Sequence, residues 1–120
     1  EIFNSNNIRT SLFINPSLQD IKLSKTLGSK CIEIHTGKIS NKIKEKKNYS
    51  RELNKIKKCA IYAQKIGLEV HAGHGMDYKT TKILNKIKQI EEFNIGHFII
   101  GESVSHSISK VVKQFIKILR

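Results

Sequence analysis

Residues 31–37 read Cys-Ile-Glu-Ile-His-Thr-Gly, and residues 68–75 read Leu-Glu-Val-His-Ala-Gly-His-Gly. Both stretches open with a short β-rich run and pass into a glycine-containing loop, which is typical of a strand that ends at a turn. Two more β-rich runs lie outside this pair. The predicted strands cover residues 10–14, 31–35, 68–72 and 93–97.

A helical pattern follows each run. The first helix is expected to begin at Asn15-Pro16, an N-cap with a first-turn proline, and to end at Gly28. The second ends before Gly67, and Asp77 caps the third. Apolar faces comprise Leu53, Ile56, Ala60 and Ala63 in the second helix, Ile83, Leu84 and Ile87 in the third, and Ile108, Val111, Val112, Phe115 and Leu119 in an amphipathic terminal helix. Strands alternating with helices indicate right-handed crossovers and a parallel sheet, hence an α/β fold.

Residues 37–48, Gly-Lys-Ile-Ser-Asn-Lys-Ile-Lys-Glu-Lys-Lys-Asn, are expected to form the only long loop. A lysine-rich run of this kind is usually a solvated surface segment. The alternative is a flap over an anionic ligand, because long loops in compact domains are often lids.

Length and composition predict one domain. The chain has 120 residues, 38% of them hydrophobic, which suits a single core. No apolar run approaches the roughly 18 residues that cross a bilayer, and no secretory leader is apparent, so we expect a cytoplasmic protein with no membrane partner. Cys31 and Cys59 lack metal-ligand spacing and are expected to be reduced core residues. The only methionine is Met76, so we expect a piece of a longer chain.

The chain is strongly basic, with 22 Lys+Arg against 10 Asp+Glu and a net charge of +12. Such a charge suggests nucleic acid, anionic membranes or phosphorylated small molecules as partners. Nearly all of the basic residues are lysine, however, whereas nucleic-acid readers favour arginine for its bidentate geometry. We therefore favour a solvated lysine surface and expect no nucleic-acid partner, with a small nucleic-acid binder as the alternative.

Four of the five histidines fall where predicted strands end. They are His35, His71, His74 and His97, whereas His106 is assigned to the terminal helix. Function in α/β folds gathers at the carboxyl ends of parallel strands. One histidine there is more often a structural group than a catalyst, but four predict a site.

Glu33 is the acidic residue of the second predicted strand. If Ile32 and Ile34 face the helices, alternation points Glu33 to the other face with Cys31 and His35. A carboxylate there needs a partner. It is either a structural partner for a nearby cation or a group that stabilises positive charge and moves protons, and the histidines nearby favour the second.

Glycines accompany the histidines at two strand ends. Gly73 and Gly75 allow close approach of backbone to a ligand, and Gly96-His97 leads into a short predicted helix at 98–103. Free amides at that helix start form an anion cradle. This arrangement matches the phosphate site common in (β/α)₈ barrels.

Four motifs in this order resemble the pyridoxine 5'-phosphate synthase family of the deoxyxylulose-dependent vitamin B6 pathway. They are RTSLFIN at 9–15, IEIHTG at 32–37, LEVHAGHG at 68–75 and FNIGHFIIG at 93–101, and the match runs from about Ile8 to the end. The resemblance implies a (β/α)₈ TIM barrel and a homo-oligomeric transferase. Its reaction condenses 1-deoxy-D-xylulose 5-phosphate with 3-amino-2-oxopropyl phosphate to pyridoxine 5'-phosphate, phosphate and water, with no metal or organic cofactor.

The resemblance also implies residue roles. His74 matches the family's general acid, and Gly75 beside it a substrate contact. Glu33 matches the carboxylate that stabilises the transition state, and Gly96 with His97 the pair that holds substrate phosphate. The resemblance gives no such role to the other two strand-end histidines, which we expect to lie behind these groups.

A (β/α)₈ barrel needs about 250 residues, so residues 1–120 are expected to be the carboxyl-terminal half of a single barrel domain and to supply its last four β/α units. Such a half would expose two sheet edges and an apolar interior. The alternative function is that of a truncated, non-catalytic remnant that binds phosphate or self-associates.

Overall fold

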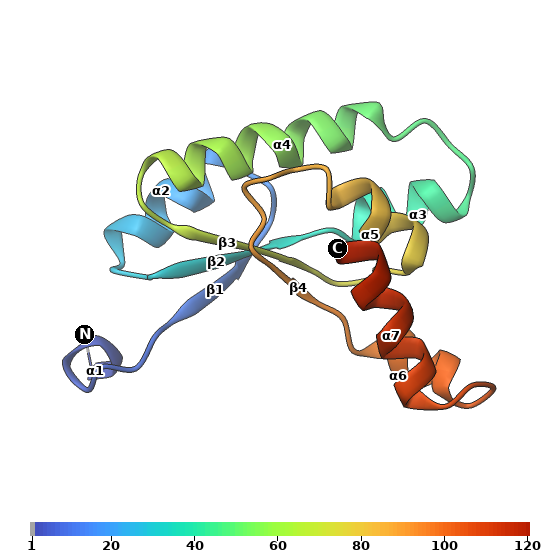
Figure 1. Ribbon diagram of the computed structural model, residues 1–120. Coiled ribbons are helices and arrows are strands. Elements are labelled where there is room, and N and C mark those ends of the chain that lie inside the picture. Colours follow the sequence, from blue (N-terminus) through green and yellow to red (C-terminus); the bar gives the residue numbers. More distant parts are fainter. Residues whose placement is uncertain (1) are drawn as a thin grey trace.

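The computed structural model describes residues 2–120 and has an α/β fold with a four-stranded parallel sheet in the order β1-β2-β3-β4 (Figure 1). The elements are α1 (Ile2–Ser5), β1 (Ser11–Ile14), α2 (Leu18–Thr26), β2 (Cys31–His35), α3 (Gly37–Lys44), α4 (Ser50–Lys65), β3 (Glu69–Gly73), α5 (Tyr78–Leu84), β4 (Glu92–Asn94), α6 (His97–Ser103) and α7 (Ile108–Leu119). The four predicted strands and the parallel sheet are confirmed. The last strand is shorter than predicted, because the chain leaves the sheet after Asn94.

The core lies between the sheet and the helices α2 and α4, which cover one face (Figure 1). Ile32 and Ile34 of β2 and Val70 of β3 point into it and are fully buried. They meet Ile21 of α2 and the predicted apolar face of α4, of which Ile56, Ala60 and Ala63 are buried. Each fully buried isoleucine contributes about 1.5–3 kcal/mol from removal of apolar surface from water.

The opposite face of the sheet is mostly polar, so the expectation of an apolar interior is wrong. Alternation places Glu33, His71 and Asn94 on this face, opposite in direction to the core residues. Phe13 is its large exposed apolar residue, at 55% exposure. The two predicted sheet edges are present, because β1 and β4 each have one strand neighbour.

Residues 37–48 are not one long loop, because α3 occupies most of them. Ile39 and Ile43 are spaced four residues apart and are both buried, together with Ser40. The two isoleucines lie on one face of the helix, and lysines occupy positions between and after them. The high lysine content made the segment look like a solvated loop in the sequence.

Helix ends differ from the prediction at two places. The N-cap of α2 is Ser17, whose side chain accepts from the Asp20 amide, so Asn15-Pro16 belongs to the preceding loop. His106 precedes α7 and is not part of it. The predicted ends at Gly28 (φ +78°) and Gly67 (φ +76°) are confirmed, as is the Asp77 cap, which accepts from the Thr80 amide at 2.7 Å.

An aromatic cluster holds α6 in place. Tyr78 of α5, Phe98 of α6 and Phe115 of α7 have ring centroids 4.6–5.9 Å apart. Of the predicted apolar stripe of α7, only Val111 and Phe115 are buried, and the rest of the stripe is exposed. No helix within residues 2–120 has both the length and the apolar content needed to cross a bilayer.

Candidate functional site

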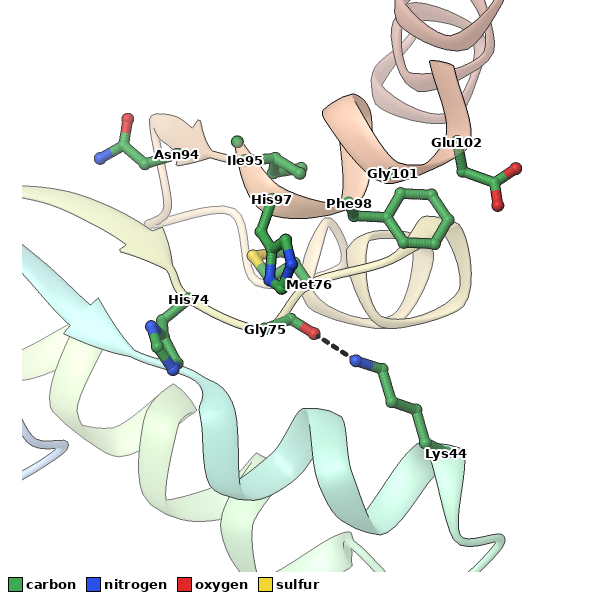
Figure 2. A pocket seen from close by; sticks show the side chains of 11 residues that line it. Lys44, His74, Gly75, Met76, Asn94, Ile95, His97, Phe98, Gly101 and Glu102 are labelled. Atoms are coloured by element: carbon green, nitrogen blue, oxygen red, sulfur yellow. Dashed lines mark hydrogen bonds between the residues drawn. The ribbon is translucent and has the colours of Figure 1, made fainter. Parts of the chain in front are cut away.

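A cavity of about 470 Å³ opens at the carboxyl ends of β3 and β4 (Figure 2). The predicted residues His74, Gly75, Gly96 and His97 all line it. The remaining lining residues are Lys44, Met76, Asn94, Ile95, Phe98, Gly101 and Glu102. The structure therefore brings the predicted acid and the predicted phosphate-binding pair to one cavity.

The loop after β3 has a constrained backbone. His74 has φ +77° and Gly75 has φ +72°, and a left-handed conformation costs a residue other than glycine about 1–2 kcal/mol. Buried Thr36 fixes this loop: its hydroxyl lies 2.8 Å from both the Gly73 and His74 carbonyl oxygens, and its amide donates to the Gly73 carbonyl at 2.9 Å. Lys44 of α3 donates to the Gly75 carbonyl at 3.1 Å (Figure 2).

His74 stacks on a second histidine. The rings of His35 and His74 have centroids 4.6 Å apart and planes inclined by 25°. Phe13 lies against both rings, with centroid distances of 5.2 Å and 6.2 Å. Burial, and next the nearby charge of His74, lower the pKa of His35, although Glu33 acts in the opposite direction. Burial and the His74 charge both disfavour the protonated form of His35.

Glu33 adjoins the cavity through Asn94. The Asn94 side-chain amide donates to the Glu33 carboxylate at 2.7 Å. Gly73 lies between them in the sheet, and a Cβ there would collide with the Glu33 carboxylate. The prediction that Glu33 points away from the helix-covered face is confirmed, whereas its catalytic role stays a prediction.

Gly96 is the N-cap of α6, and His97 is its first residue, one position earlier than predicted. His97 projects from α6 toward the loop at Gly75 (Figure 2). A Cβ added at Gly96 would meet nothing within 4 Å. The backbone at Gly96 is thus accessible from the cavity.

His71 does not join this site, so the predicted convergence of four histidines is wrong for this residue. It lies in the middle of β3 and is buried. Its Nε2 is 2.8 Å from Glu69, and its Nδ1 is 3.5 Å from Glu92. Arg9 also donates to the Glu69 carboxylate at 3.0 Å. His71 is therefore held in a charged cluster near the amino ends of the strands.

The same cluster contains the one trio of metal-ligand side chains that lie close together in the described part of the chain. Donor atoms of Cys31, Glu69 and His71 lie within 4.8 Å of one another. Burial raises the pKa of the Cys31 thiol, which disfavours the thiolate that binds metals. Glu69 already has two partners in Arg9 and His71. These contacts account for the trio as a structural network.

Comparison with known proteins decides the family. The family model described as "Pyridoxal phosphate biosynthesis protein PdxJ" matches residues 1–120. The chain belongs to the PdxJ family. The resemblance found in the four sequence motifs is thereby confirmed.

Several relatives of this PdxJ-family chain carry the name pyridoxine 5'-phosphate synthase. The chain is 62% identical to that of Pelagibacter ubique over 117 residues, which are 98% of the chain and 49% of the relative. It is 45% identical to that of Sulfurihydrogenibium sp. over 112 residues, covering 93% and 45%. The Wolbachia protein is 41% identical over 115 residues, covering 94% and 47%. The chain thus spans about half the length of these curated relatives.

Three contributors to the site were missed by sequence reasoning. Thr36 and Lys44 act through backbone carbonyls, and Asn94 acts through Glu33. Asn94 offered a signal, because it is a polar residue at the predicted end of a strand. Lys44 offered none, since it lay among many lysines in a segment interpreted as a loop.

Proposed function

We propose that this chain is the carboxyl-terminal half of a pyridoxine 5'-phosphate synthase and supplies the last four β/α units of a (β/α)₈ barrel. The reaction is the condensation of 1-deoxy-D-xylulose 5-phosphate with 3-amino-2-oxopropyl phosphate, giving pyridoxine 5'-phosphate, phosphate and water. Membership in the PdxJ family and the names of the relatives support this reaction. The observation that carries it to this chain is the cavity shared by His74, Gly75, Gly96 and His97.

His74 is the general acid in this proposal. Its side chain is at the rim of the cavity and exposed, so a protonated ring reaches a bound substrate and exchanges protons with solvent. The acid donates its proton to the hydroxyl oxygen that leaves as water, and general acid catalysis of this kind contributes roughly 10²–10⁴-fold. Thr36 supports it by holding the backbone carbonyl of His74.

Glu33 stabilises positive charge that develops on the substrate nitrogen and carbon skeleton during ring closure. Its carboxylate is half-buried on the polar face of the sheet and fixed by the Asn94 amide. A fixed carboxylate stabilises a cationic transition state without reorganising, which is why preorganisation favours catalysis.

Gly96 and His97 bind a substrate phosphate, and Gly75 contacts substrate beside the acid. The accessible backbone at Gly96 and the His97 ring face the same cavity. Lys44 adds a positive charge at its edge. Neither a metal nor an organic cofactor has a role in this proposal, and the complete protein is proposed to be a cytoplasmic homo-oligomer with phosphorylated small-molecule substrates.

The second candidate is a non-catalytic remnant that self-associates. Within the described residues 2–120, both sheet edges lack a neighbouring strand, and apolar side chains on α2 and α7 are exposed, among them Leu18, Leu23, Ile116 and Leu119. Surfaces of this kind favour association.

A chimera decides between the two candidates. About half of the Pelagibacter ubique relative lies outside the matched residues, and the amino-terminal half of that relative is fused in frame before this chain. We expect the folded chimera to form pyridoxine 5'-phosphate from the two substrates, measured by mass spectrometry, and the 120-residue chain alone to form none. A folded chimera without product would overturn the proposed function in favour of the remnant.

A further inference from the structure

The stacked rings of His35 and His74 pack against the Cα of Gly37. An added Cβ at Gly37 would lie 2.7 Å from Cε1 of His35 and 2.9 Å from Cδ2 of His74. Contacts below 3.0 Å would force at least one ring to move, so the glycine at 37 leaves the space in which both rings pack. Phe13 covers the pair from β1.

Two stacked imidazole rings are not readily protonated to the cationic form at the same time. At 4.6 Å, two like charges repel even in a watery environment. His35 is also half-buried, whereas His74 is exposed. Burial disfavours the charged form of His35, so we expect His74 to be protonated first.

Other charged and titratable groups surround the pair from several elements. They are Glu33 on β2, Lys38 and Lys44 on α3, Arg51, Glu52 and Lys55 on α4, and His97 and Glu102 on α6. The set mixes cations with three carboxylates. The two rings themselves differ in burial and are in direct contact with each other.

We propose that His35 is a positioning residue for His74: its ring holds the His74 ring by stacking, and the first proton that the pair binds goes to His74. The stacking contact fixes the ring plane, while Thr36 fixes the backbone of the same residue. For catalysis the inference rests on the proposed function, in which His74 is the acid. The order of protonation does not depend on it.

The first test is an NMR titration of the two imidazoles in the isotope-labelled 120-residue chain. We expect His74 to gain its proton at higher pH than His35. In His74→Asn the midpoint of His35 should rise by roughly 0.5–1 pH unit, because a neighbouring positive charge is gone. The control His106→Asn, which alters an exposed histidine outside the pair, should leave that midpoint unchanged.

Protonation of His35 before His74, or an unmoved His35 midpoint in folded His74→Asn, would overturn the inference. If His74→Asn does not fold, the order of the two midpoints in the unaltered chain decides alone.

The second test is kinetic and uses the chimera. His35→Phe keeps a flat ring, so its kcat should stay within about threefold of the unaltered chimera. His35→Ala removes the ring and should lower kcat about tenfold or more with little change in KM, because a misplaced acid loses rate rather than affinity. Unchanged kcat in His35→Ala, or equal losses in both variants, would contradict positioning by stacking. An inactive chimera would contradict the proposed function and leave the titration result standing.

Discussion

Asn94 of β4 donates a hydrogen bond to Glu33 of β2 across the intervening strand β3. The two side chains meet above Gly73, which has no side chain to separate them. A glycine at this register position is therefore a structural requirement of the Glu33 site.

Gly73→Ala should destabilise the chain by about 1–3 kcal/mol, because the new methyl group collides with the Glu33 carboxylate and displaces it from Asn94. The free energy of unfolding from urea denaturation measures the loss. In a Glu33→Ala background the same substitution should cost clearly less. Equal losses in the two backgrounds would show that the collision is not with Glu33.

Glu33→Gln should lower the turnover of the chimera while leaving stability within about 1 kcal/mol. The glutamine oxygen can still accept from Asn94, so the contact persists and only the charge is lost. Turnover and urea denaturation are measured on the same preparation. Loss of stability with full activity per folded molecule would instead assign Glu33 a purely structural role.

Gly96→Val should weaken phosphate binding more than His97→Ala does. Valine fills open space at the N-cap of α6 and blocks approach of an oxygen to the backbone, whereas His97→Ala leaves the amides in place. Because nothing lies within 4 Å of the added Cβ, the variant should fold. Calorimetry of inorganic phosphate and pyridoxine 5'-phosphate on the chimera measures both affinities. Undiminished affinity in Gly96→Val would place the phosphate elsewhere.

Protonation of Glu69 should account for part of the decrease in the free energy of unfolding at acidic pH. The hydrogen bond from His71 and the charge of Arg9 hold the pKa of Glu69 below its ordinary value, although burial acts in the opposite direction. A carboxyl with a depressed folded-state pKa adds stability above its unfolded pKa of about 4.3, and this stability is lost as pH falls through the folded value. In Glu69→Gln, the free energy of unfolding should fall less steeply as the pH is lowered, whereas Glu91→Gln should behave like the unaltered chain. If Glu69→Gln leaves this pH dependence unchanged, the cluster around Glu69 is not its cause.

The sequence predicted the sheet well because period-two runs bounded by glycine are local signals. It failed at α3, where Ile39 and Ile43 carry a helical spacing hidden among lysines. It also failed for His71, because nothing local shows whether a histidine in a strand lies at its end or at its centre beside Glu69. The contact between Asn94 and Glu33 joins residues 61 positions apart. A partnership of that kind depends on strand register and cannot be derived from either motif alone.

In the proposed function, the cavity at the carboxyl ends of β3 and β4 is the active site and His74 is its acid. The most direct measurement is the kcat of the chimera carrying His74→Asn. The matched control is His71→Asn, which alters a histidine of the same strand region that lies outside the cavity. We expect His74→Asn to lower kcat by roughly 10²–10⁴-fold with little change in KM, and His71→Asn to keep nearly full kcat with reduced stability. An unchanged kcat in folded His74→Asn would contradict this assignment.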